Sequence, residues 1–133
     1  MSLYRDINNN GFTDMPMYKM YIEEMENKLL TTLSSCNSKL EEYVKTIDTE
    51  LDTLYDYFCK DVEKSLEILD KITETSKLLI KNINDQIKYI NSVFNQKPSK
   101  KYTEHIANLI SIREKEQKNQ MKYLKIIHSL NAI

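Results

Sequence analysis

The fold is decided by a long stretch without glycine or proline, whose centre, residues 38–58, reads SKLEEYVKTIDTELDTLYDYF. Apolar residues recur in it at steps of three and four, the spacing of one face of an α-helix. The series continues in both directions, from Tyr18 to Phe94, in 21 steps over 76 residues, and only Ser76 in it is polar. The mean step of 3.6 residues is the period of a straight helix, whereas a two-stranded coiled coil needs 3.5. The pattern therefore predicts straight amphipathic helices that pack in a bundle.

The few helix-breaking residues predict where these helices begin and end. Gly11, Pro16 and Pro98 are the only glycine and prolines in the 133 residues. Proline fits the first turn of a helix, and it disfavours helical angles at the residue that precedes it. We therefore expect an all-α fold with a long helix or helices over about 15–96. A C-terminal helix over about 100–130 is expected to fold back as a helical hairpin, which gives an elongated, coiled-coil-like bundle.

The same helix-breaking residues predict the domain organisation. We expect a flexible segment at 1–13 and a single all-helical domain at 14–133, with the hairpin turn near 96–100. The middle of the C-terminal helix, residues 113–120, is almost wholly polar. This part is therefore either exposed to solvent or interrupts the apolar core.

Two weak stretches are candidates for a break in the long helix, the serine-rich residues 34–38 and the threonine-rich residues 73–76. The mean helix has about 11–12 residues, which favours breaks. Neither stretch contains glycine or proline, however, and the apolar series keeps its phase through both. We therefore expect a helix that is continuous over about 38–95, and breaks at the two stretches remain the alternative.

Composition excludes most kinds of catalytic site. A phosphate-binding loop needs several glycines close together, and Gly11 is the only one. Cys36 and Cys59 have no metal-ligand spacing, and each is expected as a small buried apolar residue. His105 and His128 likewise have no partner at the spacing of a metal motif. We therefore expect no enzyme, no catalytic residue, no metal site, no cofactor and no small-molecule substrate.

The sequence also predicts a compartment. Hydrophobic residues make up 41% of the chain, which is too high for a fully disordered protein. No apolar run approaches the roughly 20 residues that a membrane helix needs. The first residues have no apolar core of a secretory signal. We therefore expect an intracellular protein, cytoplasmic or nuclear, without a transmembrane segment.

The net charge of −1 hides a strong asymmetry. Residues 1–75 carry 8 basic and 16 acidic residues, whereas residues 76–133 carry 11 basic and 4 acidic ones. Four interpretations remain open: a hairpin within the chain, antiparallel pairing of two chains, binding to nucleic acid or an acidic membrane, and a solvated surface whose lysines reflect an A/T-rich genome. Binding to nucleic acid or a membrane is the weakest of these interpretations, because arginine, the side chain that most often recognises bases, is scarce. The possible basic contact surface consists of Lys97, Lys100, Lys101, Arg113, Lys118 and Lys122.

The length of the apolar stripe favours a protein partner. A second helix of about 32 residues covers only a similar length of the first, roughly residues 65–96, so that residues 18–64 still need a partner. The candidate partner-binding residues are Met17, Tyr18, Tyr21, Met25, Leu29, Leu33, Leu40, Tyr43, Ile47, Leu51, Leu54 and Phe58.

These patterns predict a non-catalytic structural or adaptor subunit. It would assemble through its apolar stripe, with itself or with other helical chains, in a larger intracellular complex. The alternative is a compact monomeric helical bundle that acts as a binding module, such as a viral or microbial host-interaction or inhibitor protein. Contact with nucleic acid or a membrane surface through the basic C-terminal helix is a weaker alternative.

Overall fold

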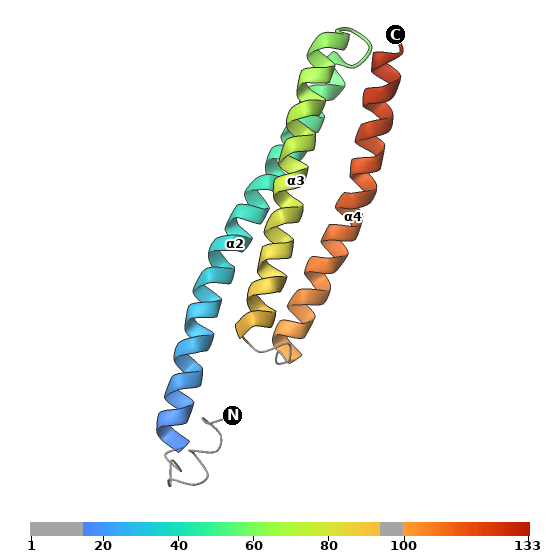
Figure 1. Cartoon of the computed structure of the whole chain (residues 1–133). Coiled ribbons are helices and arrows are strands. Elements are labelled where there is room, and N and C mark those ends of the chain that lie inside the picture. Colours follow the sequence, from blue (N-terminus) through green and yellow to red (C-terminus); the bar gives the residue numbers. More distant parts are fainter. Residues whose placement is uncertain (1–14, 94–99) are drawn as a thin grey trace. The chain divides into compact units, whose positions relative to one another are not determined.

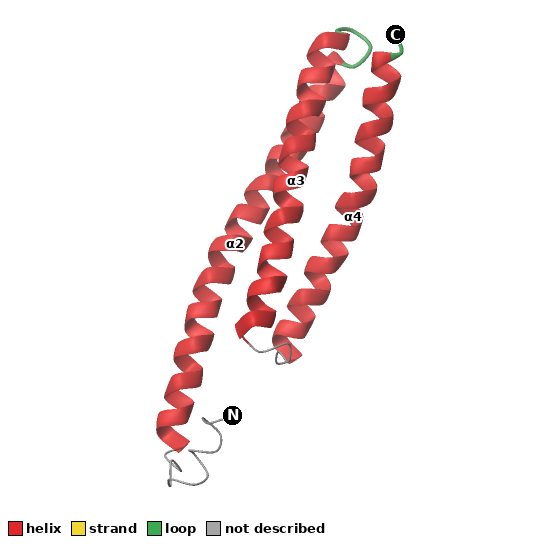
Figure 2. Cartoon of the chain, in the orientation of Figure 1, coloured by secondary structure: helices red, strands yellow, loops and turns green. Residues whose placement is uncertain are grey.

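The computed structural model describes residues 15–93 and 100–133, which form three α-helices (Figure 1). Helix α2 spans Met15–Tyr57, α3 spans Val62–Val93 and α4 spans Lys100–Asn131. No strand occurs within these two described stretches (Figure 2). The predicted all-α class is therefore confirmed.

The chain divides into two compact units, residues 1–34 and residues 35–133. Helix α2 runs from the first unit into the second, whereas α3 and α4 belong entirely to the second. Some side chains within the helices also lie outside the described part, namely those of residues 15–19, 21–23 and 101. The second unit contains the core and the candidate site.

Parts of the predicted domain organisation lie outside the described residues. These parts are the segment 1–13 and the turn near 96–100, of which only the last residue is described. The single domain over 14–133 stays a prediction. Helix α4 itself begins and ends within one residue of its predicted bounds.

The prediction of a helix continuous over 38–95 is wrong, because the helix is interrupted at residues 58–61. Both stretches that were candidates for a break, 34–38 and 73–76, are helical. The apolar series keeps its phase across the interruption, so the hydrophobic pattern contains no trace of it.

The backbone at the end of α2 explains how the chain turns without glycine or proline. The carbonyl oxygen of Tyr57 accepts hydrogen bonds from the amides of both Lys60 and Asp61, at 3.0 and 2.9 Å. Within this turn, just before Lys60, Cys59 adopts a φ of 67°, in the left-handed region that ends many helices. Cys59 is exposed rather than buried, because it occupies this turn, and Cys36 is half-buried.

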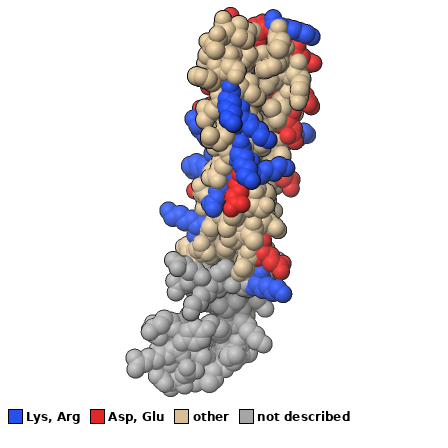
Figure 3. Space-filling model, turned by 90° about the vertical axis from the view of Figure 1, so that its right-hand side faces the viewer, with Lys and Arg blue, Asp and Glu red and all other residues tan. Residues whose placement is uncertain are grey.

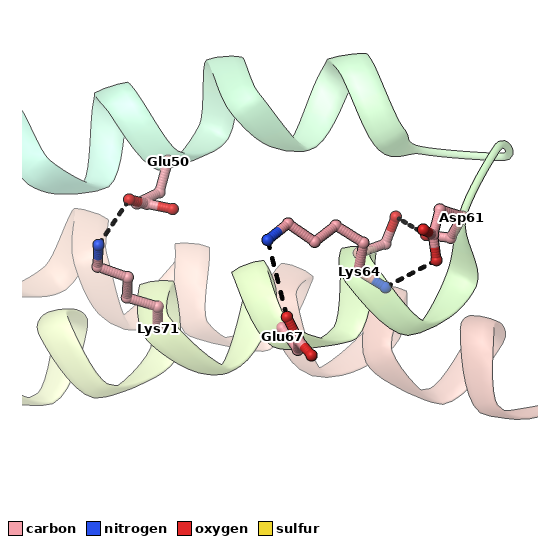
Figure 4. A network of polar contacts seen from close by, with 6 residues as sticks. Glu50, Asp61, Lys64, Glu67 and Lys71 are labelled. Carbon is pink, nitrogen blue, oxygen red and sulfur yellow. Dashed lines mark hydrogen bonds and ion pairs between the residues drawn. The ribbon is translucent and has the colours of Figure 1, made fainter.

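Helix α3 begins with a side-chain cap. The Oδ1 atom of Asp61 accepts a hydrogen bond of 3.0 Å from the backbone amide of Lys64 (Figure 4). This amide is among the first of the helix, which have no partner within it. Glu63 in the first turn adds a negative charge where the helix dipole favours one.

Polar contacts show that α2 and α3 are antiparallel. The ammonium of Lys71 on α3 meets the carboxylate of Glu50 on α2 at 2.8 Å (Figure 4). Farther from the turn, the Nδ2 atom of Asn82 donates to the carbonyl oxygen of Cys36 at 3.1 Å. Residue numbers rise along one helix as they fall along the other, so the chain reverses at residues 58–61.

A second set of contacts shows that α3 and α4 are also antiparallel. The hydroxyl of Ser76 donates to the carboxylate of Glu116, and the Nε2 atom of His105 lies 3.1 Å from Oε1 of Gln86. Because α2 and α4 each run opposite to α3, they are parallel to one another (Figure 1).

Burial identifies α3 as the central helix. Its buried residues include a series with steps of three and four, which is Ser65, Leu69, Ile72, Ser76, Leu79, Ile83, Gln86 and Ile90. In the second unit, α2 and α4 each bury only one row with a seven-residue spacing. These rows are Leu40, Ile47 and Leu54 on α2, and Tyr102, Leu109, Glu116, Tyr123 and Leu130 on α4. Helices α2 and α4 therefore each have one covered row flanked by less covered ones.

The cap predicts a measurable contribution to stability. Asp61→Ala removes the acceptor of the Lys64 amide and is expected to lower the free energy of unfolding by about 1 kcal/mol. Asp61→Asn keeps a side-chain oxygen at the cap and is expected to remain near the wild type. Urea denaturation followed by the helical circular dichroism signal measures both, and equal losses in the two variants would contradict the role of the cap.

Candidate functional site

Six of the candidate partner-binding residues belong to the first unit. Three of their side chains, those of Met17, Tyr18 and Tyr21, lie outside the described residues. Met25 is half-buried, and Leu29 and Leu33 are buried. Their role in binding a partner stays a prediction.

Three of the other six are occupied within the chain. Leu40, Ile47 and Leu54 are at most 7% exposed and belong to one apolar core with residues of α3 and α4. Residues 18–64 need a partner along their whole length only if the C-terminal helix alone folds back. The break at 58–61 brings α3 back as well, so this row is covered by the chain itself.

The remaining three stripe residues flank that row. Tyr43 and Leu51 are half-buried and pack against the core, whereas Phe58 remains 41% exposed. Leu51 and Phe58 are seven residues apart, and the amide of Phe58, just past the end of α2, donates to the carbonyl oxygen of Leu54 at 2.8 Å, so the two residues lie on one line. This line borders the space between α2 and α4.

A groove runs between the parallel helices α2 and α4, and three adjoining clefts make it up. The middle cleft has a volume of about 380 Å³. It shares Val44, Asp48 and Ile112 with the cleft on one side, and Leu51 with the cleft on the other. Because they share lining residues, the three clefts form one continuous channel, which we call the α2–α4 groove.

Two rows with a seven-residue spacing form the walls of the α2–α4 groove. They are Val44 and Leu51 on α2 with Phe58 directly after its end, and Ile112, Asn119 and Ile126 on α4. Val44, Phe58 and Ile112 keep 39%, 41% and 38% of their surface exposed. Apart from Asn119 the walls are apolar, so the groove presents a line of apolar side chains to the solvent.

One acidic side chain lies in the floor of the groove. Glu116 is only 8% exposed, and its carboxylate accepts a hydrogen bond from the Ser76 hydroxyl of α3. The other oxygen lies 3.4 Å from Nδ2 of Asn119. A buried carboxylate is costly unless it is hydrogen-bonded, so these donors stabilise it. Within residues 113–120 only Glu116 is buried, so it interrupts the apolar core, whereas the rest of the stretch is exposed or half-buried.

The same cluster changes the acidity of Tyr123. Burial raises the pKa of Tyr123 to about 12, and the negative charge of Glu116 and the hydrogen bond to it add to the shift. A smaller contribution comes from the charge of Asp48 on α2. Asp48 lines the same cleft as Glu116 and Tyr123.

The possible basic contact surface stays a prediction, because part of it lies outside the described residues. Lys97 and the side chain of Lys101 lie outside the described residues, whereas Lys100, Lys118 and Lys122 are exposed. Arg113 points to α3 instead, and its Nη1 atom donates to Oδ1 of Asn84 at 2.6 Å. Figure 3 faces the side on which α4 lies and shows Lys and Arg side chains in a column with few acidic ones between them.

Two further features bear on the expected chemistry. Burial lowers the pKa of His105, which bonds Gln86 within the bundle. Among the described residues, no group of three or more His, Cys, Asp and Glu side chains lies close enough to hold a metal ion. Over the same residues, no helix is both long and apolar enough to cross a lipid bilayer.

Sequence reasoning missed the residues that border the open side of the bundle. Val44 and Ile112 were not among the candidates, nor were the acidic residues Glu41 and Asp48. The seven-residue spacing of Val44, Leu51 and Phe58 was a signal for them, since it repeats that of Leu40, Ile47 and Leu54 one step around the helix. Without the break at 58–61, nothing indicated which row faces a neighbour.

The buried carboxylate predicts the effect of a mutation on α3. Ser76→Ala leaves Glu116 with one hydrogen-bond donor fewer, and the free energy of unfolding is expected to fall by about 1.5–3 kcal/mol. Ser129→Ala removes an exposed hydroxyl on α4 and is expected to change it little. Urea denaturation compares the two, and a loss in Ser76→Ala no larger than in Ser129→Ala would contradict the assignment.

The raised pKa of Tyr123 predicts a loss of stability in alkali. The folded state holds the phenol proton more tightly than the unfolded state, whose pKa is about 10. The resulting stabilisation is present below pH 10 and is lost as the pH rises through about 12. Ultraviolet titration of the folded protein should show one tyrosine that ionises near pH 12, and Tyr123→Phe should lose it. The same late transition in Tyr123→Phe would contradict the assignment.

The chain matches no protein-family model, no curated protein and no solved structure. No family is therefore assigned to it. The side chains of the α2–α4 groove are the basis for the function proposed below.

Proposed function

We propose that this chain is a non-catalytic helical adaptor that assembles with another helical chain through the α2–α4 groove. The observation that carries the proposal is the line of three clefts between two parallel helices, with apolar side chains left exposed in both walls. The partner helix is either that of a second copy or that of another protein in a larger assembly.

The spacing of the walls suits a docked helix. Each wall places one side chain every seven residues, which is two helical turns. An amphipathic helix presents its own apolar residues at three- and four-residue steps, so its side chains fit between those of the walls. A helix in this position would add a fourth helix to the three and would cover Val44 and Ile112. Four-helix bundles cover their apolar faces in this way.

The polar groups of the groove favour binding over catalysis. Glu116 is the buried acid of the floor, and its carboxylate already accepts hydrogen bonds from Ser76 and Asn119. A general base needs an oxygen within reach of a substrate proton. The surrounding walls are mainly apolar and exposed, as at a protein interface. These features support an adaptor rather than an enzyme.

A compact monomeric binding module remains the alternative function. The bundle of residues 35–133 has its own core, which includes Ile72, Ile83 and Leu109, and a partner's helix could occupy its groove without pairing of two copies. The two proposals share the groove and differ in stoichiometry. The oligomeric state of the purified chain separates them.

A photo-crosslinking experiment tests the groove as an interface. A benzophenone amino acid is placed at Val44 in the wall or, as a control, at Lys88, which is exposed on α3. The chain is irradiated pure and in an extract of its native cells. Adducts with a second copy or with another protein are expected from position 44, and few from position 88. Adding Ile112→Glu to the opposite wall should abolish the adducts from position 44, because it places a charge in the groove.

The outcome that overturns the proposal is equally specific. Adducts at the same level from positions 44 and 88, or none from position 44 in either sample, would show that the groove does not hold another chain. Circular dichroism of the Ile112→Glu protein verifies that its helices are intact.

A further inference from the structure

The two rims of the α2–α4 groove carry opposite charges. Glu41 and Asp48 are seven residues apart and line the groove on the side of α2, where Lys45 also lines it, so this rim has a net charge of −1. Lys115 lines it on the side of α4, and Lys122 follows seven residues later in the same row. All five residues are exposed, and within the described part of the chain none of them takes part in an ion pair.

The net charges of the two helices have the same signs as their rims. The part of α2 in the second unit, residues 35–57, has two basic and six acidic residues, a net charge of −4. Helix α4 has seven basic and three acidic residues, a net charge of +4. The basic column on the α4 side is visible in Figure 3. The groove thus lies between one acidic helix and one basic helix.

The rim charges also lie at matching levels along the bundle. The contacts of α2 and of α4 with α3 show which residues of α3 lie beside Glu41 and beside Lys115. These two positions along α3 differ by at most about two residues, or about 3 Å. The same holds for Asp48 and Lys122. Each acidic residue on one rim therefore has a basic residue opposite it on the other.

We propose that the partner is a second copy of this chain, which packs its own α2–α4 groove face to face against this one instead of inserting a single helix, with the two copies parallel about a twofold axis that runs along the helices. The inference rests on the proposed function and names its partner. A symmetric dimer uses the same surface on both copies, so that surface must be complementary to itself. The α2–α4 groove meets this condition, since its walls are apolar and its rims have opposite net charge.

The direction of the axis follows from the charges. Rotation about an axis along the helices places α2 of one copy against α4 of the other and keeps every residue at its level. Glu41 then meets Lys115 of the second copy, and Asp48 meets its Lys122. An axis across the helices would instead place α2 against α2, with acidic residues facing each other, which opposes association. The pairing is therefore parallel, unlike the antiparallel pairing considered from the sequence.

Apolar contact supplies the attraction in this arrangement. Val44, Phe58 and Ile112 each keep about 40% of their surface exposed in the single chain. Face-to-face pairing of two grooves covers these residues in both copies. Burial of apolar surface drives association, and the charged rims fix the register and exclude other partners.

A charge-reversal experiment tests the inference on the full chain. The first variant, Lys115→Glu with Lys122→Glu, makes both rims acidic, and the second, Glu41→Lys with Asp48→Lys, makes both basic. Sedimentation velocity is expected to show the wild type as a dimer and each variant alone at least about tenfold weaker in association. An equimolar mixture should dimerise again, because an acidic rim then meets a basic one on both sides.

A matched control separates rim pairing from overall charge. Lys81→Glu with Lys88→Glu makes the same change in net charge on α3, at exposed positions that do not line the groove. This variant is expected to dimerise as the wild type does. Thermal melting by circular dichroism verifies that all variants are folded.

Three results would overturn the inference. The first is a wild type that stays monomeric at about 100 µM, well above the micromolar range of ordinary interfaces. The second is a mixture of the two variants that does not dimerise. The third is a control variant whose dimerisation is weakened as much as that of the rim variants. If the wild type is monomeric but position 44 crosslinks to another protein, the proposed function stands and only the partner is wrong. If position 44 forms no adduct at all, both proposals fail.

Discussion

The hydrogen bonds from Lys60 and Asp61 to the carbonyl oxygen of Tyr57 hold the reversal on which the rest of the second unit depends. They end α2, and the carboxylate of Asp61 starts α3 four residues later. The reversal brings the apolar row of α2 against that of α3, so a stripe that would be exposed on a continuous helix becomes a core. It also sets the direction of α4, because two successive reversals of the chain leave α2 and α4 parallel. The groove exists because these two parallel helices flank a central one.

The hydrophobic pattern predicted helix content and burial well but not chain direction. The three- and four-residue steps identified Leu40, Ile47, Leu69 and Leu79 correctly as core positions, since burial follows the helical period. The break was invisible because a four-residue turn replaces about one helical turn and the series stays in phase. Its local signals were an αL position filled by cysteine and a capping aspartate. Both residue types also occur within helices, so neither identifies a turn without knowledge of the tertiary contacts.

The polar exceptions to the pattern show the same limit. Ser76 is the polar member of the apolar series, and Glu116 lies in a stretch that was expected to be solvated or to interrupt the core. Neither residue explains its position when taken alone. The structure explains both at once, because the hydroxyl of one donates to the carboxylate of the other across α3 and α4. A contact between residues 40 positions apart depends on the register of two helices, which a single sequence does not contain.

The three helix pairs differ in how their contact is secured, and this difference points to the open side of the bundle. Helices α2 and α3 follow one another through a short turn and share the Glu50–Lys71 ion pair. Helices α3 and α4 share hydrogen bonds such as that of Arg113 with Asn84. Within the described residues, no hydrogen bond or ion pair joins α2 to α4, although their rims carry opposite charges at the same levels. The acidic residues on the α2 rim and the basic residues on the α4 rim lie at the same height along the bundle and form no ion pair within the described part of the chain. They can therefore pair with a partner that places a basic rim against α2 and an acidic rim against α4. A second copy does so by symmetry.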